Sequence, residues 1–288
     1  MNTIELKSNT ALNKLKRRVP YGWDLNIYRG CIHGCKYCYA MYSHDYLKDN
    51  NFFDTVYYKS NIIELLESEL SSLNWKKEVI NIGGVTDSYQ PAEKELGLTR
   101  EVLKLMIKYK NPIIISTKSD LILRDIDLIN ELSNITYVNI AFTITTMDED
   151  IRCKLEPNSS PSIDRFKALK ELKKTNAVLG VHIMPIIPNL TDTYDNLDAI
   201  YKNASIVGVD YVLPGTLYLI GKTKPYFLKF IRDEYDNIYK SMLELYKGGS
   251  AGKEYKDKLY KMINEIKSKY SINSNYMKFQ KEKLKEER

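Results

Sequence analysis

Three of the four cysteines in the chain, Cys31, Cys35 and Cys38, stand close together, while Cys153 stands alone. This spacing is not that of a disulfide framework, and clustered thiols in a reducing compartment usually bind metal. Thiolates suit zinc or an iron–sulfur cluster. Structural zinc takes four ligands, usually as two separated pairs, and a second pair is absent here. Iron–sulfur clusters normally have four cysteine ligands, so three ligands leave one iron open to a substrate or cofactor.

The elements that must position these thiols follow from hydrophobic periodicity. Short β-branched, apolar runs predict buried parallel strands at residues 25–28, 78–82, 112–117, 137–143, 177–184 and 210–213. Helical patterns alternate with them at residues 61–73, 98–109, 121–132, 163–174 and 194–204. The alternation predicts an α/β fold, a partial (β/α)6 TIM-type barrel of parallel strands with a C-terminal helical extension. In such folds chemistry takes place at the carboxyl ends of the strands, and the cysteines directly follow the first strand.

The pattern changes after about residue 222. Residues 225–246 and 253–270 are predicted to be helical, and a glycine-rich segment separates them. The second helix has an apolar stripe that we expect to pack on the barrel: Tyr255, Leu259, Met262, Ile266 and Tyr270. We therefore predict three parts, an N-terminal segment 1–24, a partial-barrel core 25–222 and a C-terminal helical extension 223–288.

Composition indicates a soluble globular protein, because 43% of the 288 residues are hydrophobic and 28% are charged. No apolar run approaches the roughly 18 residues that a membrane span needs, and the polar N-terminus does not resemble a secretory signal. We expect a cytoplasmic protein with no membrane partner; its oligomeric state stays open. The net charge of +6 is mild. Most of it lies in residues 253–288, where a solvated face is a commoner explanation than a nucleic-acid site.

The cysteine motif, Cys31-x-x-x-Cys35-x-Tyr37-Cys38, resembles that of the radical S-adenosylmethionine (SAM) superfamily. Further segments are similar to its spore photoproduct lyase-like branch: 29–31, 38–40, 43–44, 46–47, 83–93, 96–100, 117–119, 155–157 and 185–188. The resemblance extends over residues 29–216, most of the chain.

The resemblance implies a [4Fe-4S] cluster on the three clustered cysteines, with SAM chelated by the fourth iron. Reduction, by a donor such as flavodoxin or ferredoxin, would cleave SAM to methionine and a 5′-deoxyadenosyl radical that abstracts hydrogen from a substrate. It also implies a set of cofactor contacts: Tyr37, Gly83, Gly84, Thr86, Asp87, Thr117, Lys118, Thr143 and His182. Each has a simpler structural alternative: Gly83-Gly84 as a tight turn, Lys118 as a surface residue, His182 as a core histidine.

In spore photoproduct lyase a cysteine near the end of the second strand returns a hydrogen atom to the product, and a tyrosine after the motif assists. Tyr39 matches that tyrosine and is the predicted catalytic residue, but residues 83–87 contain no thiol and Cys153 comes much later. Repair of that lesion by a cysteine relay is therefore not expected. Three hypotheses stay open: a radical SAM enzyme acting on nucleic acid, such as a pyrimidine lesion in DNA; one acting on a peptide or small metabolite; and a non-catalytic iron–sulfur or zinc protein.

Overall fold

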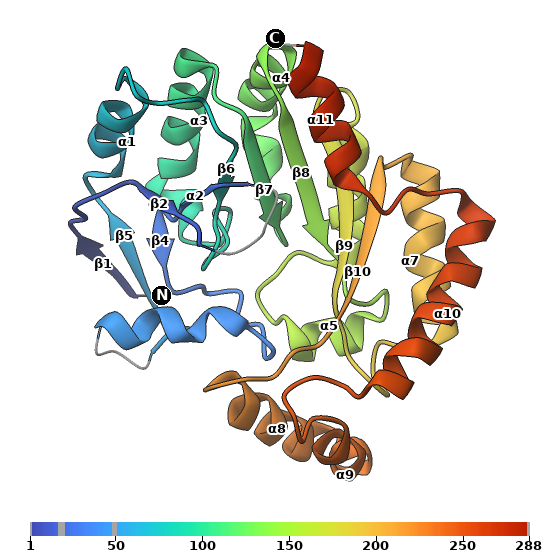
Figure 1. Ribbon diagram of the computed structural model, residues 1–288. Coiled ribbons are helices and arrows are strands. Elements are labelled where there is room, and N and C mark those ends of the chain that lie inside the picture. The colour runs from blue at the N-terminus through green and yellow to red at the C-terminus, as the bar shows by residue number, and fades with distance from the viewer. Residues whose placement is uncertain (1, 17–20, 48–50, 287–288) are drawn as a thin grey trace.

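The computed structural model describes residues 2–16, 21–47 and 51–286. Residues 1, 17–20 and 287–288 of the predicted terminal parts lie outside this range, and the division into three parts stays a prediction. The central sheet has seven strands in the order β10-β9-β8-β7-β6-β3-β2 (Figure 1). Its members are β2 (Leu12–Lys14), β3 (Trp23–Leu25), β6 (Ile80–Ile82), β7 (Ile113–Thr117), β8 (Val138–Thr143), β9 (Val178–Ile186) and β10 (Tyr211–Thr216). All pairs are parallel except β2 with β3, and over the described residues the sheet does not close into a barrel, which confirms the predicted partial barrel.

The predicted first strand at 25–28 is two strands that belong to different sheets. β3 ends at Leu25, whose carbonyl accepts from Gly83 N at 2.9 Å. Three residues later, at Tyr28, the chain enters a three-stranded sheet of β1 (Asn2–Leu6), β5 (Thr55–Lys59) and β4 (Tyr28–Arg29), in the order β1-β5-β4. This change of sheet directs the chain away from the barrel wall just before the cysteines.

Helices cover the outer face of the central sheet. They are α1 (Ile62–Leu70), α2 (Glu93–Leu96), α3 (Leu98–Tyr109), α4 (Ile126–Ile135), α6 (Ser162–Leu172) and α7 (Tyr194–Val207), with 3-10 helices η1 (Tyr39–Leu47) and η2 (Asp120–Asp125) along the chain. A further helix, α5 (Glu149–Leu155), instead packs in a second cluster with Cys35 and Tyr37. Because side chains alternate along a strand, Val138, Ile140 and Phe142 enter the main core beneath these helices. Thr143, at the end of the same strand, faces the inner side and is free to line a site.

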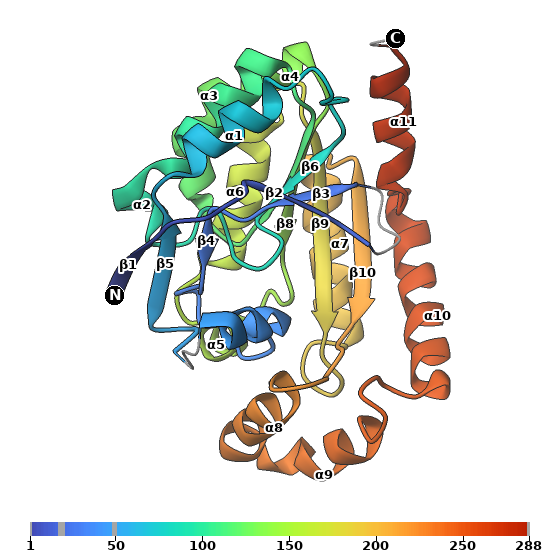
Figure 2. The same ribbon diagram turned by 60° about the vertical axis from the view of Figure 1, so that its left-hand side comes forward.

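The inner face is filled at one end by the C-terminal helix α11 (Tyr276–Glu286), which stands on the side of the sheet opposite α1 and α3 in Figure 2. Phe279 and Leu284 pack with a small cluster that includes Tyr137, Ala141 and Tyr211. At the carboxyl ends of the strands the inner face stays open. The fold therefore leaves a hollow at the position that the sequence predicts for the chemistry.

The C-terminal extension contains α8 (Thr223–Glu234), α9 (Asp236–Leu245) and α10 (Lys253–Tyr270) before α11. The helix predicted over 225–246 is broken at Tyr235, whose φ of −144° and ψ of 52° are not helical and whose ring packs against Phe230. The apolar stripe of α10 packs on the main core as expected, with Leu259 and Ile266 buried. Over the described residues, no helix is long and apolar enough to cross a membrane.

Candidate functional site

A cavity of about 750 Å³ lies at the carboxyl ends of the barrel strands. It is lined by the cysteine loop, defined here as residues 31–38, by the ends of β7 to β10, and by residues 216–223. Every residue predicted from the sequence for the cluster, the cofactor and catalysis lines this cavity, with the exception of Gly84. The structure thus brings together residues that are up to about 150 positions apart in the sequence.

The three thiols of the cysteine loop are unpaired and face the cavity. Burial raises the pKa of all three, to about 12 for Cys35, and the nearby Asp87 carboxylate adds to the effect at Cys31. Thiolates at this site therefore need a positive partner, and metal binding supplies one by displacing the thiol protons.

The donor set fits a [4Fe-4S] cluster with one iron not ligated by protein, because three thiols on one loop share the cavity and Cys153 does not. Among the described residues, no group of three His, Cys, Asp or Glu side chains is close enough together to hold a single metal ion. The fit therefore rests on the chemistry and common placement of the three thiols.

The segment that follows β6 holds the start of the cysteine loop. Thr86 Oγ1 donates to Gly30 O at 2.7 Å, and Gln90 Nε2 donates to the same carbonyl at 3.0 Å. Gln90 Oε1 accepts from Ile32 N at 3.0 Å. Thr86 was predicted as a cofactor contact; it lines the cavity, but its hydroxyl is engaged with the protein backbone.

Asp87 joins three segments of the site. Its carboxylate lies 3.1 Å from His33 Nε2 in the cysteine loop and accepts from Thr117 Oγ1 and Lys118 N, both at 2.8 Å, at the end of β7. Burial raises the pKa of Asp87, but the His33 charge and hydrogen bond outweigh burial, so that the pKa falls to about 2. The oxygens of this predicted cofactor contact are thus occupied by protein donors.

Gly83 and Gly84 form the turn after β6 for different reasons. Gly83 has a φ of +91°, a conformation that favours glycine, and a Cβ there would lie 2.8 Å from Thr86 O. A Cβ on Gly84 would lie 2.5 Å from Asp24 Oδ2, so the space beside Gly84 belongs to that carboxylate and not to the cavity. The backbone of Gly84 still reaches the site, since its carbonyl accepts from Tyr39 Oη at 2.6 Å.

Lys118 brings a positive charge to the cavity. Its ammonium lies 5.8 Å from the Tyr37 ring, and the structure gives it no hydrogen bond or ion pair with another described residue. Burial lowers the pKa of Lys118, but the negative charges of Cys35, Glu156 and Asp87 outweigh burial and raise it. The ammonium is therefore charged at neutral pH and available to an anionic ligand.

Thr143 and His182 line the cavity on β8 and β9, beside the end of β7 that carries Lys118, and the two strands pair in the register Thr143↔His182. Burial and the charge of Lys118 lower the pKa of His182 to about 4, so the imidazole is neutral. Its Nε2 lies 3.3 Å from Tyr211 Oη, which itself donates to Asn139 Oδ1 at 2.8 Å. His182 therefore both faces the cavity and belongs to a polar network in the barrel floor.

Sequence reasoning predicted Tyr39 but missed two further tyrosines at the cavity rim, Tyr42 and Tyr218. Tyr39, Tyr42 and Tyr218 are 58%, 49% and 57% exposed, and all three line the cavity. Tyr218 follows β10, and the other two belong to η1, a 3-10 helix with no amphipathic pattern that would predict it. For Tyr42 and Tyr218, the only signal in the sequence is the high tyrosine content, 23 residues.

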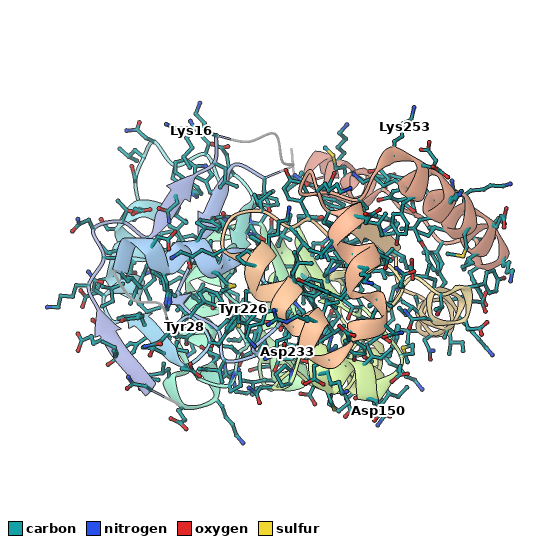
Figure 3. The ribbon with its side chains drawn as sticks, turned by 90° about the horizontal axis from the view of Figure 1, so that it is seen from below. Lys16, Tyr28, Asp150, Tyr226, Asp233 and Lys253 are labelled. Carbon is teal, nitrogen blue, oxygen red and sulfur yellow. The ribbon has the colours of Figure 1, made fainter. Side chains whose placement is uncertain are left out.

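Cys153 lies outside the cavity, on α5. It lines a separate groove of about 480 Å³ with Lys36, Lys154 and Tyr226, and Arg152 Nη2 donates to its sulfur at 2.7 Å. Figure 3 shows the side of the molecule on which α8 presents Tyr226 and Asp233, two other residues that line this groove. The fourth thiol therefore opens on the outer side of the cysteine loop.

Comparison with known proteins gives consistent similarities. The family model of the radical SAM superfamily matches residues 25–200. An uncharacterized protein of Methanocaldococcus jannaschii is 30% identical over 92% of this chain and 93% of its own length. An uncharacterized protein of Mycobacterium tuberculosis is 28% identical over 93% of this chain and 81% of its own length.

Among solved structures, a spore photoproduct lyase mutant with bound AdoMet and dinucleoside spore photoproduct has a similar fold. Its TM-score is 0.70 at 12% identity, over 93% of this chain and 79% of that one. A second spore photoproduct lyase structure, complexed with the dinucleoside spore photoproduct, has a TM-score of 0.69 at 11% identity, again over 93% and 79% of the two chains.

Proposed function

Since the chain belongs to the radical SAM superfamily and is an enzyme of that class, we propose that it cleaves SAM reductively and uses the resulting radical on a substrate held at the tyrosine rim. The observation that carries this proposal is the shared cavity, which collects three thiols and the Lys118 ammonium at the carboxyl ends of the strands. That edge is where barrel folds place their chemistry.

Cys31, Cys35 and Cys38 would hold the [4Fe-4S] cluster. When bound, the cluster supplies the electron that splits SAM into methionine and a 5′-deoxyadenosyl radical, after a carrier such as flavodoxin or ferredoxin has reduced it. The residues of the chain would bind and orient the cofactor and shield the site. Thr86 and Gln90 fix the start of the cysteine loop, and Asp87 ties the loop to the end of β7.

Lys118 would bind the carboxylate of SAM, since its ammonium faces the cavity with no anionic partner within ion-pair distance among the described residues. Thr143 and His182 would contact the adenosyl portion, since both line the cavity on the two strands that follow β7. Because His182 is neutral, it can accept or donate one hydrogen bond there without adding a second positive charge.

A planar substrate is favoured by the exposed rings of Tyr39, Tyr42 and Tyr218 at the mouth of the cavity. Aromatic rings that remain exposed beside a cavity are suited to stacking on bases, so a nucleic-acid substrate, such as a pyrimidine lesion, is the first candidate. A peptide or small metabolite is the second candidate, because the cavity of about 750 Å³ is large enough to take a small molecule together with the cofactor.

The return of hydrogen to a product radical would not use a cysteine relay. Of the described cavity-lining residues, only the three cluster cysteines have thiols, and Cys153 lies in the outer groove. Tyr39 lines the cavity and its hydroxyl donates to Gly84 O, which supports a role in positioning or hydrogen transfer. The structural neighbours bind the spore photoproduct. We expect this protein not to repair that lesion rapidly.

Anaerobic reconstitution tests the proposal. The wild-type protein should bind about four irons per chain and form 5′-deoxyadenosine from SAM with dithionite. Replacing Cys31, Cys35 or Cys38 by alanine should abolish both, because an iron would lose its ligand. Cys153→Ala is the matched control and should keep both. A protein that binds no iron, or in which Cys153→Ala removes the cluster, contradicts the assignment.

A further inference from the structure

The last residue of α5 and the three residues that follow it lie directly against the cysteine loop. Lys36 N donates to Leu155 O at 2.9 Å. Asn158 N donates to His33 O at 3.2 Å, and Asn158 O lies 3.0 Å from His33 Nδ1. We refer to residues 155–158 as the support loop, because they contact the cysteine loop on both sides of Cys35.

Glu156 is the buried centre of the support loop. Its side chain is fully buried, and Oε1 accepts hydrogen bonds from Tyr37 Oη and, at 3.0 Å, from Thr145 Oγ1. Tyr37 stands between Cys35 and Cys38 in the sequence. Of the two side chains between these cluster ligands, only Tyr37 is buried. The Glu156 carboxylate therefore holds the buried side chain between the last two ligands.

The charge of Glu156 is balanced by cations. Arg165 Nη2 lies 2.6 Å from Glu156 Oε2 with both side chains fully buried, and Arg165 also donates to Thr143 O at 2.7 Å. Burial raises the pKa of Glu156, but the charges of Arg165 and Lys118 outweigh burial and lower it to about 2. The carboxylate is therefore ionised when the protein is folded.

A buried ion pair is weak evidence for stability, because desolvation offsets most of the attraction between the charges. Stability alone therefore does not explain why the Glu156–Arg165 pair is buried beside the cysteine loop. Glu156 also acts electrostatically on Cys35, whose surroundings include the Glu156 carboxylate and the cations Lys118 and Arg165. The net charge and hydrogen bonding around an iron–sulfur cluster set its reduction potential.

We propose that Glu156 is a positioning residue for the cluster: it fixes the cysteine loop through Tyr37 and places a fixed negative charge beside Cys35 that lowers the reduction potential. The inference rests on the proposed function, since it assumes that the three cysteines hold a cluster. It extends that function by giving the support loop a part in the electron transfer that starts the reaction.

Two substitutions separate the two roles. Glu156→Gln keeps the length of the side chain and its acceptor oxygen but removes the charge. Glu156→Asp keeps the charge but is one methylene too short to hold Tyr37. The reduced fraction of the cluster is measured by electron paramagnetic resonance at poised potentials without SAM, and its retention by the rate at which a chelator removes iron.

Glu156→Gln should raise the ratio of reduced to oxidised cluster about tenfold at a fixed potential, a positive shift of about 59 mV for one electron. Glu156→Asp should keep the wild-type potential but lose iron several-fold faster. Tyr37→Phe, which removes the hydroxyl and no charge, should behave like Glu156→Asp. If Glu156→Gln does not fold, Glu156→Asp and Tyr37→Phe still test whether Glu156 positions the cysteine loop.

Glu149→Gln is the matched control on α5, the helix that precedes Glu156, because Glu149 pairs with Arg152 at 2.7 Å and bonds no residue of the cysteine loop among those described. It should match the wild type in both readouts. The inference fails if Glu156→Gln has the potential of Glu149→Gln, or if Tyr37→Phe and Glu156→Asp lose iron at the wild-type rate. A wild type without a cluster would overturn the proposed function and the inference together. A cluster that cannot cleave SAM would overturn the function alone, since neither readout uses SAM.

Discussion

Single side chains decide most of what the cavity can do, and Lys118 is the clearest case. Its charge faces the cavity while the carboxylates nearest to it, Asp87 and Glu156, are engaged with His33 and Arg165. Lys118→Met keeps much of the length and apolar stem but removes the charge. We expect the SAM dissociation constant to rise about 10- to 100-fold, the loss of one charge-assisted hydrogen bond or two, with the cluster retained.

Equilibrium dialysis of the cluster-loaded variant against SAM measures this effect. Lys104→Met is a suitable control, because Lys104 is an exposed residue of α3 that pairs with Glu101 away from the cavity. An unchanged SAM affinity in Lys118→Met would show that the ammonium serves the substrate or the fold instead.

His182 makes the stability of the protein depend on pH. Its pKa is lowered from 6.5 to about 4 by burial and by the charge of Lys118. His182 is therefore protonated below pH 6.5 in the unfolded chain but only below about pH 4 in the folded chain. Stability from this group is complete above pH 6.5 and is lost as the pH falls toward 4. His182→Gln should therefore flatten the decline in unfolding free energy between those values by up to about 1.4 kcal/mol per pH unit.

Urea titrations of the two proteins across this pH interval give the comparison. Equal slopes for the wild type and His182→Gln would mean that the imidazole is solvated and titrates near its ordinary pKa in the folded state.

At the scale of elements, the sequence predicts what periodicity encodes. The buried strands β6 to β10 and the amphipathic helices α3, α4 and α7 have apolar patterns that sequence analysis detects. β1 escapes it, because four of its five residues are exposed and its pairing with β5 joins segments about 50 residues apart. The break at Tyr235 also escapes, since no glycine or proline marks it and packing against Phe230 is a tertiary effect.

The site shows the same division. The three cysteines and Lys118 are predictable because residue type and spacing, or position after a strand, reveal them. Gly84 is placed correctly in the turn, but the carboxylate of Asp24 that occupies the space beside it comes from a strand 60 residues earlier. The hydrogen bond that Tyr37 donates to Glu156 is of the same kind, because only the folded chain brings the support loop against the cysteine loop.

The helix α10 tests the role of the C-terminal extension. Ile263 is buried where α10 packs on the core that it shares with α7. Ile263→Ala should lower the free energy of unfolding by about 2–4 kcal/mol through lost burial and a new cavity. Lys261→Ala, an exposed position on the same helix, should change it by less than about 0.5 kcal/mol.

Denaturant unfolding monitored by circular dichroism compares the two variants. A small loss for Ile263→Ala would mean that α10 is docked only loosely and that the barrel is stable without it.

For the molecule as a whole, the net positive charge and the exposed tyrosines lie in different parts of the surface. Most of the net charge of +6 lies in residues 253–288, yet no described residue of α10 or α11 lines the cavity. Exposed tyrosines, in contrast, gather at the cavity mouth. If nucleic acid is the substrate, stacking at the rim should govern productive binding, and the basic helix should add only weak, salt-sensitive attraction.

We therefore expect Tyr42→Ala and Tyr218→Ala each to weaken binding of a fluorescent single-stranded oligonucleotide by about 5- to 150-fold, the range for losing one stacked base. The double variant Lys258→Ala with Lys261→Ala, on the exposed face of α10, should weaken it by less than about threefold at 150 mM salt. Fluorescence anisotropy of the cluster-loaded protein at two salt concentrations distinguishes the two contributions. If only the lysine variant loses affinity, binding is a property of the basic helix, and the rim tyrosines serve a peptide or a small metabolite in place of a base.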